Sequence, residues 1–181
     1  SASPSTVAVG GMSGLTASLK KNSDDVDTSL MGMGTFPDGV TVNFAGTLGT
    51  VMPASATTAS AVASSTYTAG GTPGAGSASS TVDGQTVTQP ITVTVGPLAT
   101  LSFVQQPTNT VISGTITPAV TVQAKDAFNN NIPGVLVTLS LSMGTGTLGG
   151  TLTQVTNGSG IATFSNLSLD TAGSGKKLTA T

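Results

Sequence analysis

Few side chains in this sequence could do chemistry. The chain has no His, no Cys, no Arg and no Glu, and its charged side chains are five Lys and seven Asp. Acid–base catalysis near neutral pH would therefore depend on Asp carboxylates or Lys amines. No arrangement of these residues matches a known catalytic motif, and the sequence predicts a protein that is not an enzyme.

Three of the seven Asp lie close together, at Asp24, Asp25 and Asp27. Hard cations bind carboxylate and carbonyl oxygens, so one interpretation is a Ca²⁺ site. The alternative, which we favour, is a solvated loop between two strands, because the spacing matches no EF-hand or other set of calcium ligands. No cofactor is therefore predicted, and chelation of calcium is expected to leave thermal stability unchanged.

A second polar cluster consists of Asp126 and the three Asn residues 129–131. Asp and Asn side chains bond to their own backbone and tolerate left-handed conformations, so the cluster predicts a tight turn between strands. A calcium-binding role for Asp126 at the junction of two modules is the alternative interpretation.

Two covalent modifications are conceivable from the sequence. The sequons that begin at Asn157 and Asn166 would accept glycans in an exported protein, although a chain rich in Ser and Thr produces sequons easily. An amide bond between a Lys and an Asn side chain is a second idea, with Lys20, Lys21 or Lys125 as the donor. That chemistry needs a buried carboxylate beside the pair, and in a chain without Glu we do not favour it.

The charge balance and the aromatic content exclude several partners. The formal net charge is −2 and no basic cluster is present, which argues against nucleic acid, because binding it requires Lys or Arg against the phosphates. No stretch approaches 18 apolar residues, so no membrane insertion is expected. The chain has no Trp and a single Tyr, Tyr67, which disfavours an aromatic sugar-binding platform. The five Phe are expected in cores or turns.

The composition and the alternation of residues predict an all-β protein. Ser and Thr make up 55 of 181 residues, Gly adds 24, and 37% of positions are hydrophobic. Val and Thr suit a pleated, half-buried surface. Apolar and polar residues alternate over short runs bounded by Gly, Pro and Asn, which is typical of strands. The clearest runs are Leu15 to Leu19, Val40 to Phe44, Thr86 to Val95, Ile116 to Ala124 and Val135 to Leu141.

An internal repeat divides the chain into two modules. Val40 to Phe44, followed by Gly46-Thr-Leu-Gly49, is similar to Val137 to Leu141, followed by Gly146-Thr-Leu-Gly149. A period near 100 residues with about seven short strands matches one immunoglobulin-like sandwich per repeat. We therefore expect two tandem immunoglobulin-like antiparallel β-sandwiches, over residues 1–96 and 97–181.

The repeat also predicts that each module lacks one strand. Residues 83–95 form a turn and a final strand in module one, whereas Thr181 aligns with Val82, so the last strand of module two is expected to be missing. Residues 98–105 have no counterpart before Ser3, so the first strand of module one is expected to be missing. Either a longer tandem array or a neighbouring copy would complete each sandwich.

A family resemblance rests on four segments of the second module. Residues 101–107, 119–126, 134–139 and 156–164 resemble the tandem bacterial immunoglobulin-like repeats of the invasin and intimin type. The similarity covers residues 98–181 and is looser over residues 1–96. The resemblance implies sandwich modules in the stalks of cell-surface adhesins and other exported proteins.

The outward-facing set of residues in such sandwiches would be Thr, Ser and Gly, which make a neutral surface. The sequence therefore predicts a non-catalytic structural repeat module of an extracellular, cell-surface or fibre-forming protein. Its expected partners are neighbouring repeats or identical copies in a fibre. The alternative is a ligand-binding or carbohydrate-binding adhesive module.

Overall fold

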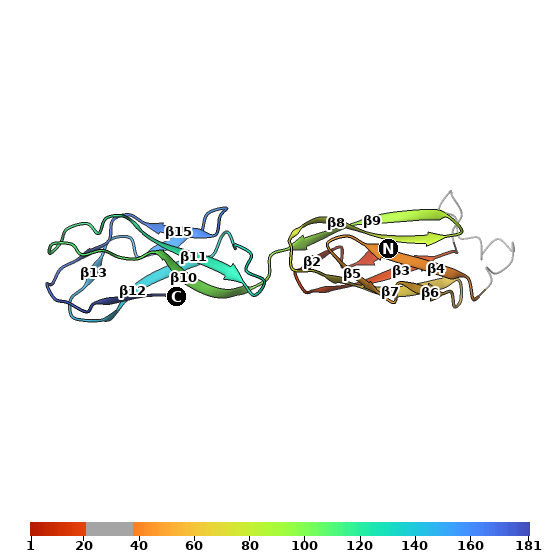
Figure 1. Cartoon of the computed structure of the whole chain (residues 1–181), viewed down its shortest axis with the longest axis horizontal. Coiled ribbons are helices and arrows are strands. Elements are labelled where there is room, and N and C mark those ends of the chain that lie inside the picture. The colour runs from red at the N-terminus through yellow and green to blue at the C-terminus, as the bar shows by residue number, and fades with distance from the viewer. Residues whose placement is uncertain (21–37) are drawn as a thin grey trace. The chain divides into compact units, whose positions relative to one another are not determined.

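The computed structural model describes residues 1–20 and 38–181, which form strands, turns and loops (Figure 1). The chain divides into two compact units, Ser1–Val95 and Gly96–Thr181, called unit 1 and unit 2 below. The described part of the chain contains no helix, which confirms the all-β prediction. It therefore also has no helix of a length and hydropathy that would cross a membrane.

Unit 1 is a sandwich of two sheets. One sheet has the strand order β1-β3-β7-β5 and the other has the order β2-β9-β8-β4-β6. The strands are β1 Ala2–Ser3, β2 Thr6–Ala8, β3 Met12–Ser18, β4 Thr41–Gly46, β5 Gly49–Met52, β6 Ser55–Thr57, β7 Val62–Ala69, β8 Gly74–Val82 and β9 Gln85–Thr94. The first segment changes sheets, because β1 pairs antiparallel with β3 whereas β2 pairs parallel with β9.

The core of unit 1 lies between these sheets and follows the alternation in the sequence. Val42 and Phe44 are buried on β4, and Tyr67 is fully buried on β7. On β9, Ile91 and Val93 are buried but Val87 is 61% exposed. Val87 alternates onto the same face of β9 as these two residues, so this face of the strand is buried in its second half and exposed in its first.

Unit 2 is built from shorter strands. Its sheets have the orders β10-β11-β15, β14-β12-β17 and β13-β16. The strands are β10 Leu98–Gln105, β11 Val120–Asp126, β12 Leu136–Met143, β13 Leu148–Gly149, β14 Thr153–Val155, β15 Ile161–Phe164, β16 Ser168–Leu169 and β17 Lys177–Ala180. Alternate residues again form the core, which includes Val120, Val122, Val137, Leu139 and Phe164.

Hydrogen bonds give a repeat register that differs from the sequence alignment. In unit 1 the Gly39 N–H donates to the Thr58 carbonyl at 2.8 Å, and in unit 2 Gly134 donates in the same way to Thr156 at 2.9 Å. The pairing of β4 with β6 likewise corresponds to that of β12 with β14. Residues 40–44 therefore correspond to residues 135–139, and the alignment with residues 137–141 is wrong by two positions.

A slip of two residues leaves every side chain on the same face of a strand, so an alternating pattern cannot reveal it.

The same comparison of hydrogen bonds shifts by one position the residue of unit 1 to which Thr181 corresponds. Thr138 and Thr181 exchange backbone hydrogen bonds of 2.8 and 2.9 Å, in the place where Asn43 pairs with Thr81. Thr181 therefore corresponds to Thr81 rather than to Val82.

The first strand of unit 1 also differs from the expectation. β1 pairs antiparallel with β3, which is the position that β10 occupies beside β11 in unit 2. A short counterpart of β10 is therefore present before Pro4. Two residues are too few to produce the period-2 signal from which strands are predicted.

Candidate functional site

The Asp126 turn is the most elaborate polar arrangement of unit 2. Asp126 ends β11 and is 3% exposed. Its Oδ1 accepts hydrogen bonds from the N–H groups of Phe128 and Asn130, both at 2.9 Å. Its Oδ2 accepts from the N–H of Gly96 at 2.9 Å and from Asn130 Nδ2 at 3.0 Å. Four N–H donors thus surround one carboxylate.

These contacts set the pKa of Asp126. Burial acts to raise the pKa, but the hydrogen bonds from Asn130, Gly96 and Phe128 outweigh it and lower the pKa from 3.8 to about 2. The carboxylate is ionised at neutral pH and serves as the acceptor that closes the turn, as the interpretation as an Asx turn requires.

The other calcium candidates, Asp24, Asp25 and Asp27, lie outside the residues that the structure describes. Among residues 1–20 and 38–181, no three Asp side chains gather into a group that could hold a metal ion. Calcium binding by Asp126 remains the alternative interpretation, and a cation there would have to displace the four N–H donors that its oxygens already accept.

Lys125 lies on the same turn. Its Nζ donates to Asn129 Oδ1 at 2.9 Å in an exposed position. The nearby carboxylate, Asp126, is held ionised, whereas assisted formation of a Lys–Asn amide bond requires a carboxylic acid that can exchange protons. Lys20 is the last residue of the described range 1–20, and Lys21 lies outside the described residues.

Both sequon Asn residues are exposed and organise turns, but in the second sequon Leu167 is fully buried and Ser168 is half-buried. Asn157 Oδ1 accepts hydrogen bonds from the N–H groups of Ser159 and Ile161, at 2.9 and 3.1 Å. Asn166 accepts from the N–H of Thr151 at 2.9 Å, and its Nδ2 donates to Thr151 Oγ1 at 3.0 Å. The first sequon is exposed at all three of its residues, so Asn157 is the better predicted acceptor.

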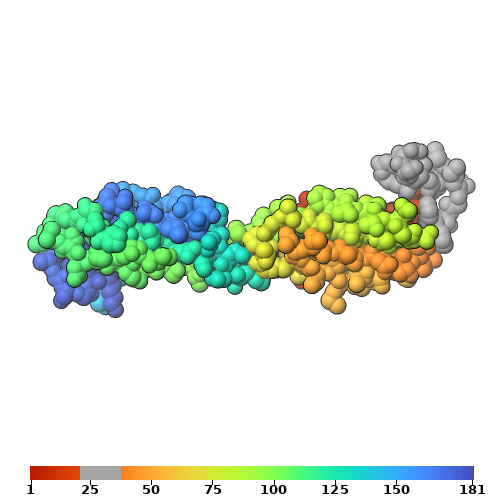
Figure 2. Space-filling view, turned by 45° about the horizontal axis from the view of Figure 1, so that its top comes forward, coloured from red at the N-terminus to blue at the C-terminus, as the bar shows by residue number. Residues whose placement is uncertain are grey.

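The open sheet edge of unit 2 lies beside β17, after which the repeat predicted a missing last strand. In the described chain, β17 pairs with β12 alone, whereas its counterpart β8 lies between β4 and β9. A groove of about 890 Å³ lies between residues 107–112 and residues 171–176, and Leu178 of β17 also lines it. In Figure 2 the dark blue C-terminal residues and the green surface that precedes β11 meet at this end of the unit.

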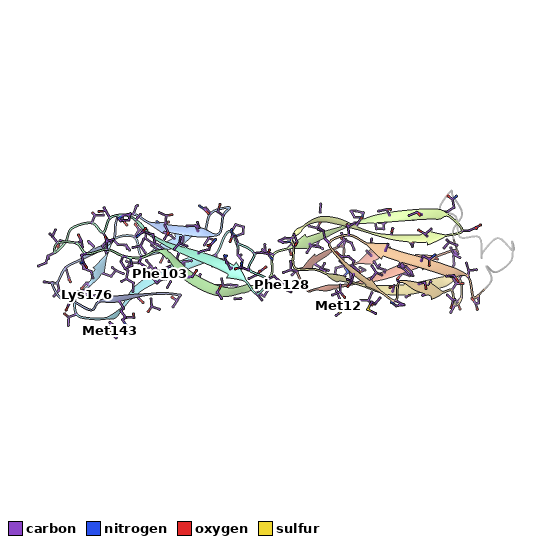
Figure 3. The ribbon with its side chains drawn as sticks, viewed as in Figure 1. Met12, Phe103, Phe128, Met143 and Lys176 are labelled. Atoms are coloured by element: carbon purple, nitrogen blue, oxygen red, sulfur yellow. The ribbon has the colours of Figure 1, made fainter. Side chains whose placement is uncertain are left out.

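Apolar side chains line this groove. Ile112 is 58% exposed, whereas Val9, which occupies the corresponding position of unit 1, is 7% exposed. The correspondence follows from the turns, because Gly11 donates to the Ala8 carbonyl as Gly114 donates to the Val111 carbonyl. Leu178 also lines the groove, as does Lys176, which Figure 3 places at the same end of the unit as Met143. Val111 and Ile112 form an apolar pair in a segment rich in Thr, and this pair was the signal in the sequence from which the groove could have been predicted.

Comparison with solved structures identifies the fold. The chain is similar to the Escherichia coli adhesin FdeC over 99% of its own length and 57% of that chain, with 20% identity and a TM-score of 0.59. It is also similar to InvD of Yersinia pseudotuberculosis, over 99% of its length and 50% of that chain, with 23% identity and a TM-score of 0.52. The fold is that of bacterial immunoglobulin-like adhesin domains.

This immunoglobulin-like fold confirms the predicted fold class and the resemblance on which it partly rested. The D0-D1 domain of intimin is a further structure of this kind, with 18% identity over 99% of this chain and 87% of that one, and a TM-score of 0.41. No protein-family model matches the chain, and no curated protein matches its sequence. The chain spans about half the length of FdeC and InvD.

Proposed function

We propose that this chain is a non-catalytic structural module of an extracellular or cell-surface protein of the adhesin type. The observation that carries the proposal is the similarity to FdeC, described as an adhesin, which extends over both units at once. A tandem pair of immunoglobulin-like sandwiches adds length to a surface protein without requiring a reactive site. The supporting solved structures are themselves bacterial immunoglobulin-like adhesin domains.

The surface chemistry supports a structural role over an adhesive one. The outward positions of β3, β7 and β9 are mostly Ser and Thr, and Tyr67 is buried in the core rather than displayed. Phe128 is 50% exposed on the Asp126 turn (Figure 3), but a single ring does not make a platform for a sugar. Neutral, short side chains suit a spacer between repeats.

Two measurements test the proposal. Antibodies raised against the chain should label intact cells that produce the protein, and brief treatment of those cells with an external protease should remove the label. Labelling only after the cells are permeabilised would contradict the surface location. The purified chain should bind no glycan on an array and no host-cell surface. Saturable binding with a dissociation constant below about 100 μM would favour the adhesive alternative instead.

A further inference from the structure

Two strands near opposite ends of the sequence of unit 1 are neighbours that run in the same direction. β2 pairs parallel with β9, in a register that places Val7 opposite Val93. The chain enters β2 at its N-terminal end and leaves β9 at its C-terminal end, so these two points lie at opposite ends of the paired segment. A pull between the two ends of unit 1 therefore draws β2 and β9 past each other along their length.

We propose that the β2–β9 pair is a mechanical clamp, a contact by which unit 1 resists tension applied between its two ends. Cross-strand hydrogen bonds lie across the direction of such a pull, so all of them carry the force together. In a hairpin that is opened from its free end, by contrast, the bonds carry the force one after another. The resistance is a property of the fold of unit 1 and does not depend on the location of the protein.

Backbone hydrogen bonds close the clamp at both of its ends. At one end the Thr92 N–H donates to the Ser5 carbonyl at 2.8 Å. At the other end the Val9 N–H donates to the Thr94 carbonyl at 2.9 Å. The paired residues of β2 and β9 lie between these two bonds. The strands cannot slide by one residue without breaking all of these bonds, because every donor would lose its acceptor in the same step.

Apolar side chains shield the inner side of the clamp. Val7 and Val9 of the β2 segment are buried in the same cluster as Ile91 and Val93 of β9. A backbone hydrogen bond under tension is lost more readily where water can replace it. The core side of the clamp excludes water, and a slip of β2 would also have to withdraw Val7 and Val9 from the core.

The segments on either side of β2 are fastened to the other sheet. Before β2, the Pro4 carbonyl accepts a hydrogen bond of 2.7 Å from the hydroxyl of Ser13 on β3, whose side chain is 1% exposed. After β2, the Gly11 carbonyl accepts the N–H of Ala69 on β7 at 2.8 Å. These contacts hold both ends of β2 in place, so tension reaches the clamp along the strands and does not lift β2 away from β9.

Force spectroscopy on single molecules of the full chain tests the clamp, and the absence of Cys from the sequence leaves engineered Cys residues as unique attachment points. The pair Ser1→Cys and Pro97→Cys pulls β2 lengthwise against β9. The pair Thr72→Cys and Pro97→Cys pulls instead on the open end of the β8–β9 hairpin, where Gly74 lies opposite Val93. At equal loading rate, we expect the lengthwise pull to need at least about twofold more force to unfold unit 1. Equal forces in the two geometries would overturn the proposal.

A matched pair of core variants separates the clamp from the general stability of unit 1. Val7→Ala shortens a buried side chain on β2, and Val42→Ala makes the same change on β4, which is not drawn along β9 by the lengthwise pull. Forced unfolding depends on the barrier that the pulled strands set and not on the total free energy of unfolding. Val7→Ala should therefore lower the unfolding force by at least about one quarter.

Val42→Ala should lower the melting temperature of unit 1 at least as much as Val7→Ala does, because Val42 is fully buried, yet leave the unfolding force nearly unchanged. The comparison of the two pulling geometries needs no core variant, so it decides the question even where one of these variants fails to fold. Unfolding forces that follow the melting temperatures of the two variants would assign the resistance to the core as a whole and would overturn the clamp.

Discussion

Asp126 Oδ2 accepts a hydrogen bond of 2.9 Å from the backbone N–H of Gly96, which lies 30 residues earlier in the chain. The first residue of unit 2 is thereby fixed to the end of β11, and β10 begins two residues later, at Leu98. Because the same carboxylate also closes its own turn through Phe128 and Asn130, one side chain organises two separate backbone segments.

Replacement of this carboxylate should therefore destabilise unit 2 selectively. In Asp126→Asn, one side-chain oxygen becomes an NH₂ group that faces N–H donors, so acceptors are lost for two of the four hydrogen bonds. We expect the melting temperature of unit 2 to fall by several degrees and that of unit 1 to stay unchanged, as measured by calorimetry. Asp83→Asn, at an exposed turn of unit 1, is the matched control and should have little effect. Equal stability of both variants would contradict the role of Asp126.

The stability of unit 2 should also depend on acidic pH. The pKa of Asp126 is about 2 in the folded protein, below its ordinary value of 3.8, so its contribution is complete above about pH 4 and is lost as the pH falls toward 2. The hydrogen bond from the Thr147 N–H and that from Thr171 also lower the pKa of Asp170, which adds to the loss in the same direction. Denaturant unfolding at several pH values should show this decline, and it should be weaker in Asp126→Asn. A parallel decline in both proteins would assign the effect to other groups.

Calcium removal should leave the chain unchanged. The oxygens of Asp126 already accept four hydrogen bonds from N–H groups, and a cation would have to displace these donors. We expect the same melting temperatures in EDTA and in millimolar Ca²⁺. A rise of several degrees on addition of Ca²⁺ would indicate a binding site, and the residues Asp24, Asp25 and Asp27 would then be the first to replace.

The fold was predictable because its main signal is local. Alternation over Val40 to Phe44 and over Val135 to Leu141 identified β4 and β12, and their buried residues lie on the expected faces. The register between the repeats was not predictable, because period 2 is insensitive to a shift by two residues. Only the long-range hydrogen bonds, such as those of Thr58 and Thr156, resolve it.

The candidate site was predicted less well, for a related reason. Asp126 and its Asn neighbours were assigned to a turn because Asx chemistry acts within a few residues. Its bond to Gly96 depends on the three-dimensional path of the chain. The exposure of Ile112 depends in the same way on the strand that covers Val9 in unit 1 and has no equivalent in the described part of unit 2.

Thr156 and Thr58 should be equally sensitive to removal of their hydroxyl groups. Both are 3% exposed, and their Oγ1 atoms accept the N–H groups of Val135 at 2.9 Å and Val40 at 3.0 Å. Thr156 also donates to the Ile132 carbonyl at 2.8 Å. Replacement by Val leaves buried backbone groups without partners, so Thr156→Val and Thr58→Val should each cost about 1–3 kcal/mol in their own unit.

Denaturant unfolding of each variant, with hydrogen exchange to assign the affected unit, measures these losses. Thr138→Val is the control: its hydroxyl is exposed, and it should change stability by less than about 0.5 kcal/mol. If Thr58→Val left the free energy of unfolding unchanged while Thr156→Val lowered it, the two turns would be equivalent in structure but not in their contribution to stability.

The two repeats should differ in their tolerance of a side chain at the position of Gly160. It corresponds to Ala61, because Leu19 donates to the Ala61 carbonyl and Ala124 donates to the Gly160 carbonyl, both at 2.9 Å. Both residues have positive φ, 61° for Ala61 and 72° for Gly160. In unit 2, however, a Cβ on Gly160 would lie 3.0 Å from the Ala124 carbonyl oxygen and 3.0 Å from the backbone nitrogen of Ile132. Gly160→Ala should therefore destabilise unit 2 by about 1–3 kcal/mol.

Gly158→Ala, in the same turn, is the matched control, because a Cβ there would have no atom within 4 Å. Its replacement should be neutral or slightly stabilising, since Ala restricts the unfolded chain more than Gly does. Denaturant unfolding of the two variants and of the unmodified chain measures this difference in stability. Equal stabilities would mean that the close approach of β11 and the Ile132 segment to Gly160 relaxes without cost, and that unit 2 accepts a side chain at this turn as readily as unit 1 accepts Ala61.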